Sequence, residues 1–123
     1  MKKNILYLVS IFSFLLLLGG CSKVSDEDLL AAHDAYNNGA LIIDVRTKEE
    51  FKDGHIKQAV NIPLQNLEKY YQYIPKDKEI IVYCRSGSRS SMAAEYLKEQ
   101  GRVVYDVATQ GDWERKLPTL SKK

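Results

Sequence analysis

Residues 79–84 are the most informative stretch of the chain, because the run Ile80–Tyr83 within it is apolar at every position. Successive side chains of a strand point to opposite faces, so a strand made of this run has to be covered on both sides. Such strands are typical of parallel sheets in α/β proteins. The strand is predicted to end at Cys84, and a polar loop over Arg85–Arg89 separates it from a helix predicted over Ser90–Gln100. The chain is therefore expected to fold as a sheet between two layers of helices.

Strand and helix signals alternate through the rest of the chain. The other predicted strands are Ala40–Val45, Ala59–Ile62 and Val103–Val107. The other predicted helices are one that Ser25 caps and Asn37–Gly39 ends, one that begins with a capping box of Thr47 and Glu50, and one that begins at Asn66. This alternation predicts a mainly parallel sheet with right-handed crossovers, and in such sheets ligands bind beyond the carboxyl ends of the strands. Cys84 and the loop after it occupy such an end.

A signal peptide is predicted at the start of the chain. A short basic segment, Met1–Asn4, precedes an apolar run over Ile5–Leu18. At about 1.5 Å rise per residue, a helix over this run is shorter than the ~30 Å hydrocarbon core of a membrane. The run ends in Leu18-Gly19-Gly20-Cys21, which resembles the lipobox of bacterial lipoproteins. A plain secretory peptide with an incidental Cys is the alternative, and both alternatives imply export.

The lipobox resemblance sets the expected domain boundaries. It implies a lipid on Cys21, so that residues 1–20 are the signal peptide and residues 21–24 a lipid-attached tether. A single domain is then expected over residues 25–117, with a tail over residues 118–123. The protein is expected to be anchored to the cell membrane and to face the periplasm or the exterior.

The charge and the cysteine count narrow the class of protein. The net charge of +2 comes from Lys2 and Lys3, so the mature domain is near neutral and nucleic-acid binding is not expected. With Cys21 lipidated, Cys84 is a lone thiol, which in an exported protein indicates a reactive group or an intermolecular bridge. Two His and one free Cys have no metal-site spacing, and neither a metal nor a cofactor is expected. We expect a monomer.

The loop after Cys84 contains the residue types that would hold a thiolate. A free thiol with a pKa of about 8.5 is mostly protonated at neutral pH, so a nucleophilic sulfur needs nearby positive charge or hydrogen-bond donors. A strand, a tight loop and a helix turn backbone N–H groups toward the sulfur. The loop residues that would complete an anion-binding site are Arg85, Ser86, Gly87, Ser88 and Arg89. The alternative is that Cys84 is a small buried residue at a strand end.

Five motifs in a fixed order resemble the rhodanese family. They are Asp44-Val45-Arg46, Glu50-Phe51, Gly54-His55-Ile56, Ala59–Pro63 and Val82–Ser90. The resemblance implies a rhodanese-like three-layer α/β/α fold with a mainly parallel five-stranded sheet. It implies a sulfurtransferase that carries sulfane sulfur as a persulfide on Cys84, with Arg85–Arg89 binding the oxyanion end of a small sulfur-containing anion such as thiosulfate. Asp44 and Arg46 lie near the expected mouth of this site, and their expected role is an ion pair or a turn contact.

The resemblance is weakest at Gln110-Gly111-Asp112-Trp113. The family often has a glycine pair some residues before a Trp, whereas this segment contains a single glycine. The C-terminal rim of the site is therefore expected to be shortened. Trp113 is expected to cover the edge of the core.

Two other functions are compatible with the sequence. Cysteine-dependent phosphatases and arsenate reductases also place a Cys and an Arg on a strand, a loop and a helix. Their pattern resembles C-x5-R, whereas four residues separate Cys84 from Arg89 here, which predicts a bowl too tight for phosphate. The other alternative is a membrane-tethered module that binds a partner or carries sulfur without turnover.

Overall fold

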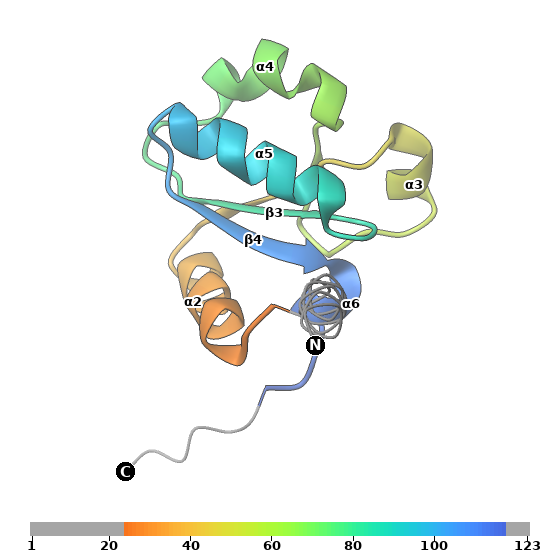
Figure 1. Ribbon diagram of the computed structural model, residues 1–123, viewed down its shortest axis with the longest axis vertical. Coiled ribbons are helices and arrows are strands. Elements are labelled where there is room, and N and C mark those ends of the chain that lie inside the picture. The colour runs from red at the N-terminus through yellow and green to blue at the C-terminus, as the bar shows by residue number, and fades with distance from the viewer. Residues whose placement is uncertain (1–23, 118–123) are drawn as a thin grey trace, which may run out of the picture.

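The computed structural model describes residues 24–117, which form a three-layer α/β/α domain (Figure 1). Its strands are β1 (Leu41–Asp44), β2 (Val60–Asn61), β3 (Ile80–Cys84) and β4 (Val104–Thr109). Its helices are α2 (Asp26–Asn37), α3 (Lys48–Lys52), α4 (Leu67–Tyr70), α5 (Ser88–Glu99) and α6 (Gln110–Trp113), with the 3-10 helices η1 (Leu64–Asn66) and η2 (Tyr71–Tyr73) on either side of α4. The predicted signal peptide, the predicted lipid attachment at Cys21 and the predicted tail lie outside the described residues.

The sheet has four strands in the order β2-β1-β3-β4, and each strand is parallel to its neighbours. The prediction of a parallel α/β fold is confirmed, but the five-stranded sheet is wrong for residues 24–117. The physical reason is that four segments of this part of the chain are extended and paired, and the segment before β1 is the helix α2 rather than a fifth strand. No helix among the described residues is long and apolar enough to cross a membrane.

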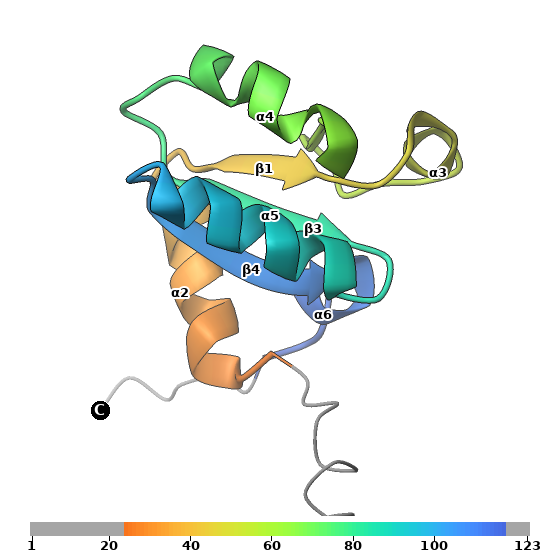
Figure 2. The same cartoon turned by 45° about the horizontal axis from the view of Figure 1, so that its top comes forward.

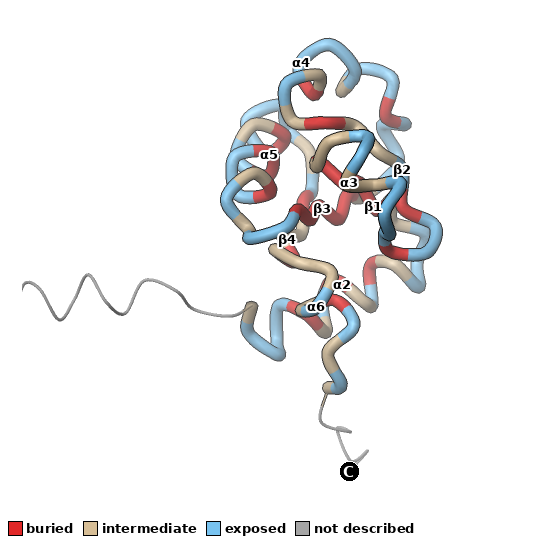
Figure 3. The backbone as a smooth tube through the Cα atoms, turned by 90° about the vertical axis from the view of Figure 1, so that its right-hand side faces the viewer, coloured by how far each residue is buried: buried red, intermediate tan, exposed pale blue. Residues whose placement is uncertain are grey.

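Helices cover both faces of the sheet (Figure 2): α4 and α5 lie on one face, and α2 and α6 lie on the other. Alternate side chains of β3 enter the two cores, since Ile80 and Val82 belong to the α5 side and Ile81 and Tyr83 to the α2 side. All residues of β3 are buried, and Figure 3 shows this strand at the centre of the domain. The apolar run in the sequence therefore has the two-sided cover that it predicts.

Two helix starts follow the predicted capping chemistry. The Ser25 hydroxyl accepts a hydrogen bond from the Asp28 N–H at 3.1 Å and begins α2. The predicted capping box before α3 is confirmed, because the Thr47 hydroxyl accepts from the Glu50 N–H and the Glu50 carboxylate accepts from the Thr47 N–H. Short elements with few buried residues depend on such caps, and α3 buries none of its residues.

Two other predicted helices differ from the sequence expectation. The helix predicted from Asn66 is a succession of η1, α4 and η2, because the backbone at Asn66 and Tyr70 has ψ near zero and interrupts the regular α-helix. Helix α5 begins at Ser88 rather than Ser90. The positive φ of Gly87, +97°, turns the chain into the helix two residues earlier, so Ser88 and Arg89 are helical residues and the true loop is shorter.

Candidate active site

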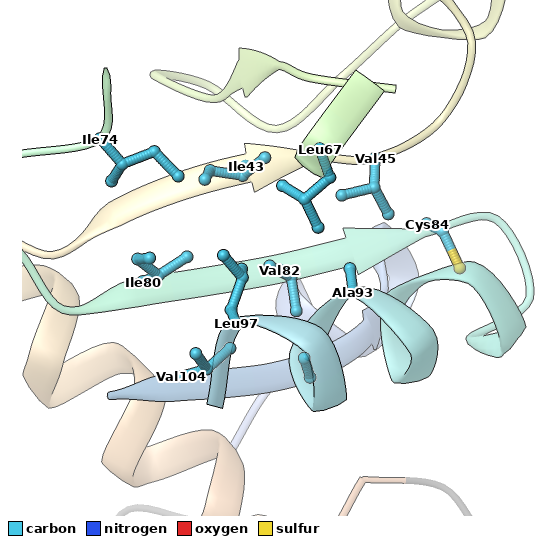
Figure 4. Packing of buried hydrophobic residues seen from close by; sticks show 11 residues of the cluster. Ile43, Val45, Leu67, Ile74, Ile80, Val82, Cys84, Ala93, Leu97 and Val104 are labelled. Atoms are coloured by element: carbon cyan, nitrogen blue, oxygen red, sulfur yellow. The ribbon is translucent and has the colours of Figure 1, made fainter. Parts of the chain in front are cut away.

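Cys84 is the last residue of β3, at the carboxyl edge of the sheet. It belongs to the apolar cluster that α4 and α5 cover, together with Val45, Leu67 and Ala93. Figure 4 shows its side chain beside the first turn of α5, where the loop from the strand enters the helix. The site predicted at a strand's carboxyl end therefore coincides with a helix N-terminus.

Two backbone N–H groups donate hydrogen bonds to the Cys84 sulfur. The donor of Gly87 lies 3.1 Å from Sγ, and that of Ser90 lies 3.2 Å from it. The Gly87 donor can reach the sulfur because its left-handed backbone, which glycine adopts at little cost, folds the loop back on the strand end. The Ser90 donor belongs to the first turn of α5, whose amides have no partner within the helix. Such donors stabilise negative charge on the atom that accepts from them.

The sulfur is enclosed as well as hydrogen-bonded, since Cys84 is 1% exposed to solvent. A persulfide on Cys84, which the family resemblance implies, requires a thiol that a donor can approach, and in the conformation described here the thiol is closed to solvent. The loop covers the sulfur on one side with the Gly87 amide, and the apolar cluster under α5 encloses the other side. Any reagent that attacks the thiol therefore requires residues around the loop to move.

Arg89 is held by a carboxylate that the sequence interpretation does not include in the site. Its guanidinium donates to both carboxylate oxygens of Glu50, at 2.7 and 3.0 Å, and the two side chains are 33% and 23% exposed. The hydrogen bonds from Arg89 lower the pKa of Glu50 to about 2, and Glu50 in turn raises the pKa of Arg89. The ion pair therefore orients the Arg89 guanidinium through Nη1 and Nη2, while its Nε–H makes no hydrogen bond within residues 24–117. The capping box already marks Glu50 in the sequence as a hydrogen-bonding residue. Its second partner, Arg89, lies 39 residues further along the chain, so sequence spacing does not reveal the pair.

The remaining polar residues of the loop lie at the surface. Arg85, Ser86 and Ser88 are exposed. Within residues 24–117, the Arg85 guanidinium takes part in no ion pair, so it is available to an anion at this surface. The loop therefore divides into an outer group of these three side chains and an inner pair of amides at the sulfur.

A buried network behind the site joins β1, β3 and the chain after α3. The Asp44 carboxylate is fully buried and accepts from the Arg46 guanidinium, with a shortest distance of 2.7 Å, and from the Tyr83 hydroxyl at 2.8 Å. The predicted ion pair of Asp44 and Arg46 is therefore confirmed. Burial raises the pKa of Tyr83 to about 12, so its hydroxyl stays protonated and keeps donating to Asp44. The same hydroxyl accepts from the Ile56 N–H at 3.0 Å, which ties the loop before β2 to the sheet.

The domain should lose the stabilising contribution of the Glu50 and Arg89 pair in acid. In the unfolded chain Glu50 takes up a proton near its ordinary pKa of 4.5, whereas the folded state holds that pKa at about 2. The unfolded state therefore binds more protons between these values, so the pair's contribution is complete above about pH 4.5 and is lost as the pH falls toward 2. Glu50→Gln should flatten the fall in the urea midpoint over this range, and Glu49→Gln, at the exposed neighbouring position, should leave the fall unchanged. Equal slopes in the Glu50→Gln variant and the wild type would contradict the assignment.

Metal ligands are not gathered at this site. Among residues 24–117, no group of three or more His, Cys, Asp or Glu side chains could hold a metal ion. The polar groups that surround the sulfur are hydrogen-bond donors, namely the amides of Gly87 and Ser90. Donors of this kind are suited to binding a small anion.

The fold and the site together define a class of protein: a parallel α/β domain with a cysteine at a strand end, bound by the amides of a short loop and of the helix that follows. The Rhodanese-like domain family matches residues 25–110 of the sequence, and the chain belongs to this family. The predicted family is confirmed.

Relatives of the chain include named sulfurtransferases. It is 37% identical over 76 residues to a sulfurtransferase of Allochromatium vinosum, a match that covers 62% of this chain and 71% of the relative. It is 34% identical over 68 residues to the thiosulfate sulfurtransferase GlpE of Coxiella burnetii, covering 54% of this chain and 64% of the relative. These names support a rhodanese-type enzyme.

Solved structures have the same fold. A rhodanese-related protein from Thermoplasma volcanium superposes with a TM-score of 0.62 at 30% identity, covering 78% of this chain and 94% of that one. A rhodanese from E. coli, solved with anions, gives a TM-score of 0.57 at 30% identity, covering 65% of this chain and 95% of that one. The chain covers only 18% of CoADR-RHD from Bacillus anthracis, at a TM-score of 0.61 and 31% identity, so the fold also forms one part of a longer protein.

Proposed function

We propose that the protein is a sulfurtransferase that carries sulfane sulfur as a persulfide on Cys84. The Cys84 thiolate attacks the outer sulfur of a donor such as thiosulfate, a new S–S bond forms on Cys84, and sulfite leaves with the electron pair of the broken S–S bond. A thiophilic acceptor such as cyanide then attacks the outer sulfur of the persulfide and leaves as thiocyanate, which restores the thiolate. Atoms and charges balance in both steps without a further reactant.

The pair of amide donors at the Cys84 sulfur carries this proposal. A cysteine that only fills space at a strand end behaves as a small apolar side chain and needs no hydrogen-bond donors. Here two N–H groups converge on Sγ, from Gly87 in the loop and from Ser90 in the helix. Both stabilise the anion that attacks the donor, and both can do the same for the persulfide that replaces it.

The outer loop residues are assigned to the donor's oxyanion end. Arg85 supplies a surface guanidinium that forms no ion pair with the described part of the chain, and the exposed hydroxyls of Ser86 and Ser88 supply further donors. Arg89 is assigned to the same end through its Nε–H, because its Nη1 and Nη2 groups donate to Glu50. A small sulfur-containing anion such as thiosulfate is the substrate class that matches this division.

The spacing of the arginine ranks the phosphatase alternative lower. Cysteine-dependent phosphatases resemble C-x5-R, whereas four residues separate Cys84 from Arg89, which favours a smaller anion site. The spacing therefore argues for sulfur transfer.

The burial of Cys84 favours a second candidate function, a module that holds sulfur without turnover. A sulfur with 1% exposure is protected from solvent, which suits storage or carriage of a persulfide more than rapid exchange. The two functions share the persulfide and differ in whether an acceptor can remove its outer sulfur quickly.

Lipid anchoring at Cys21 is part of the proposal, with the domain held at the cell membrane and facing the periplasm or the exterior. Its support is the sequence Leu18-Gly19-Gly20-Cys21 after an apolar run. Full-length protein in its bacterial host should fractionate with membranes and take up labelled palmitate, and Cys21→Ser should lose both properties. Membrane association that survives in Cys21→Ser without labelled lipid would argue for a different means of attachment.

The activity test uses purified protein with thiosulfate and cyanide. We expect thiocyanate to be released, and we expect the mass of one sulfur atom to be added at Cys84 when cyanide is omitted. Aryl phosphate cleavage without thiocyanate would reverse the ranking in favour of a phosphatase. Sulfur added to Cys84 without thiocyanate release would favour the carrier.

A further inference from the structure

Strand β4 contains one residue more than β3 beside the loop of Cys84. Val82 pairs with Asp106 and Cys84 pairs with Thr109, so the register shifts between these pairs. This irregularity is a β-bulge, and bulges commonly redirect a side chain near a site. The residue within it that departs from extended geometry is Ala108, whose φ is +60°.

The conformation of Ala108 is unfavourable for a residue with a Cβ. Left-handed backbone brings the Cβ of an L-residue close to its own carbonyl oxygen, so glycine is the residue that normally occupies it. The Asp106 carboxylate accepts from the Ala108 N–H at 2.9 Å and holds the turn in this shape. Strain of this kind persists where the surrounding structure imposes it, and it gathers near functional sites.

The methyl group of Ala108 lies against the loop that covers the sulfur. A Cβ built on Gly87 would lie only 3.2 Å from the Ala108 Cβ and 3.8 Å from its Cα, so the two residues are in close contact. Gly87 is also the residue whose N–H donates to the Cys84 Sγ. Ala108 therefore contacts the part of the loop that must move before a donor can reach the thiol.

We propose that Ala108 is a positioning residue whose methyl group holds Gly87 and its loop closed over Cys84, so that the site accepts narrow anionic donors and resists bulky ones. The part of this proposal that concerns donors rests on the proposed sulfurtransferase function. The part that concerns access to the thiol stands on the contacts of Ala108, Gly87 and Cys84 alone. Removal of the methyl group should loosen the loop and relieve backbone strain at the same time.

The test compares Ala108→Gly with Gln58→Gly in the full-length chain. Gln58 is the matched control, because it also has a positive φ, +73°, but is exposed in the loop between α3 and β2. Both variants should raise Tm by about 3 °C, because the relief of strain exceeds the extra conformational entropy that glycine gives the unfolded chain. Ala108→Gly alone should raise the rate of Cys84 alkylation by iodoacetamide, by about fivefold, since the loop's opening equilibrium shifts. Peptide mass spectrometry separates the label on Cys84 from that on Cys21.

The outcomes distinguish this inference from the proposed function. Equal alkylation rates in the two variants would overturn the role of Ala108, and so would faster alkylation accompanied by a lower Tm, which would indicate a loosened fold.

Alkylation does not depend on sulfur transfer. Faster alkylation with no thiocyanate release by either protein would therefore overturn the proposed sulfurtransferase function and leave the role of the loop intact. If thiocyanate is released, kcat/KM for an aryl thiosulfonate should rise more in Ala108→Gly than kcat/KM for thiosulfate, and equal changes would contradict the selection against bulky donors.

Discussion

Replacement of Cys84 by Ser is expected to abolish persulfide loading and to lower thiocyanate release by about three orders of magnitude or more. The serine hydroxyl is protonated at neutral pH and forms no persulfide, so the attack on the donor's outer sulfur is lost. Oxygen at this position can still accept from the amides of Gly87 and Ser90, which hold the sulfur in the wild type. The loop should therefore keep its shape, and the loss should be chemical. Steady-state thiocyanate formation and intact-protein mass after thiosulfate treatment are the measurements.

The second cysteine provides the matched control for this experiment. Cys21→Ser replaces the other cysteine of the chain and should leave purified protein fully active in thiocyanate formation. The near-ultraviolet circular dichroism of Cys84→Ser should match that of the wild type, because a collapsed fold would lose activity for a trivial reason. Thiocyanate release by a well-folded Cys84→Ser variant at more than about a tenth of the wild-type rate would rule out the Cys84 persulfide as the intermediate.

Asp44→Asn is expected to lower the free energy of unfolding by about 3 kcal/mol. The carboxylate is fully buried and accepts from both Arg46 and Tyr83, so an amide in its place turns an NH₂ group toward at least one of these donors. The guanidinium of Arg46, which is 12% exposed, then loses the charge that compensates it. Urea unfolding followed by fluorescence of Trp113 measures the change.

Two further variants make the result for Asp44 interpretable. Asp77→Asn, at an exposed position, should change stability by less than about 0.5 kcal/mol. Tyr83→Phe keeps the ion pair but removes the hydroxyl that links Asp44 to the Ile56 amide, and should cost about 1–2 kcal/mol. If Asp44→Asn fails to fold, the intermediate value for Tyr83→Phe still tests the network. A loss below about 1 kcal/mol for Asp44→Asn would contradict the importance of the buried charge.

Much of the fold could be predicted from local patterns. The apolar run in β3 required cover on both faces, and the structure provides it from α2 and α5. The capping box at Thr47 and the stop at Gly39 are short-range hydrogen-bond and backbone preferences, so they are visible in sequence windows of a few residues. The sheet's size was predicted less well, because a fifth strand came from the family resemblance and not from a run of residues in the domain.

The site, too, has features that could be predicted from local sequence and features that could not. The position of Cys84 at a strand end, the turn at Gly87 and the helix N-terminus beyond it follow from consecutive residues. The roles of Arg89 and Ala108 could not be predicted, because each depends on a partner from another part of the chain. Arg89 carries the same charge whether it faces an anion or Glu50, and spacing does not distinguish the two. The missing glycine pair indicated a difference near Trp113, but not that Ala108 would take a left-handed backbone against Gly87.

The amino-acid sequence alone determined the family, the alternation of strands and helices, and the cysteine at which chemistry is expected, since these depend on side-chain periodicity and on motifs of adjacent residues. Only the tertiary structure decided that the Cys84 sulfur is enclosed, that Arg89 donates to Glu50, and that Ala108 in the bulge of β4 lies against Gly87 of the loop. Solvent access and long-range contacts arise from packing between elements distant in the chain. They depend on how the layers pack together, and the spacing of residues within a short segment does not determine that packing.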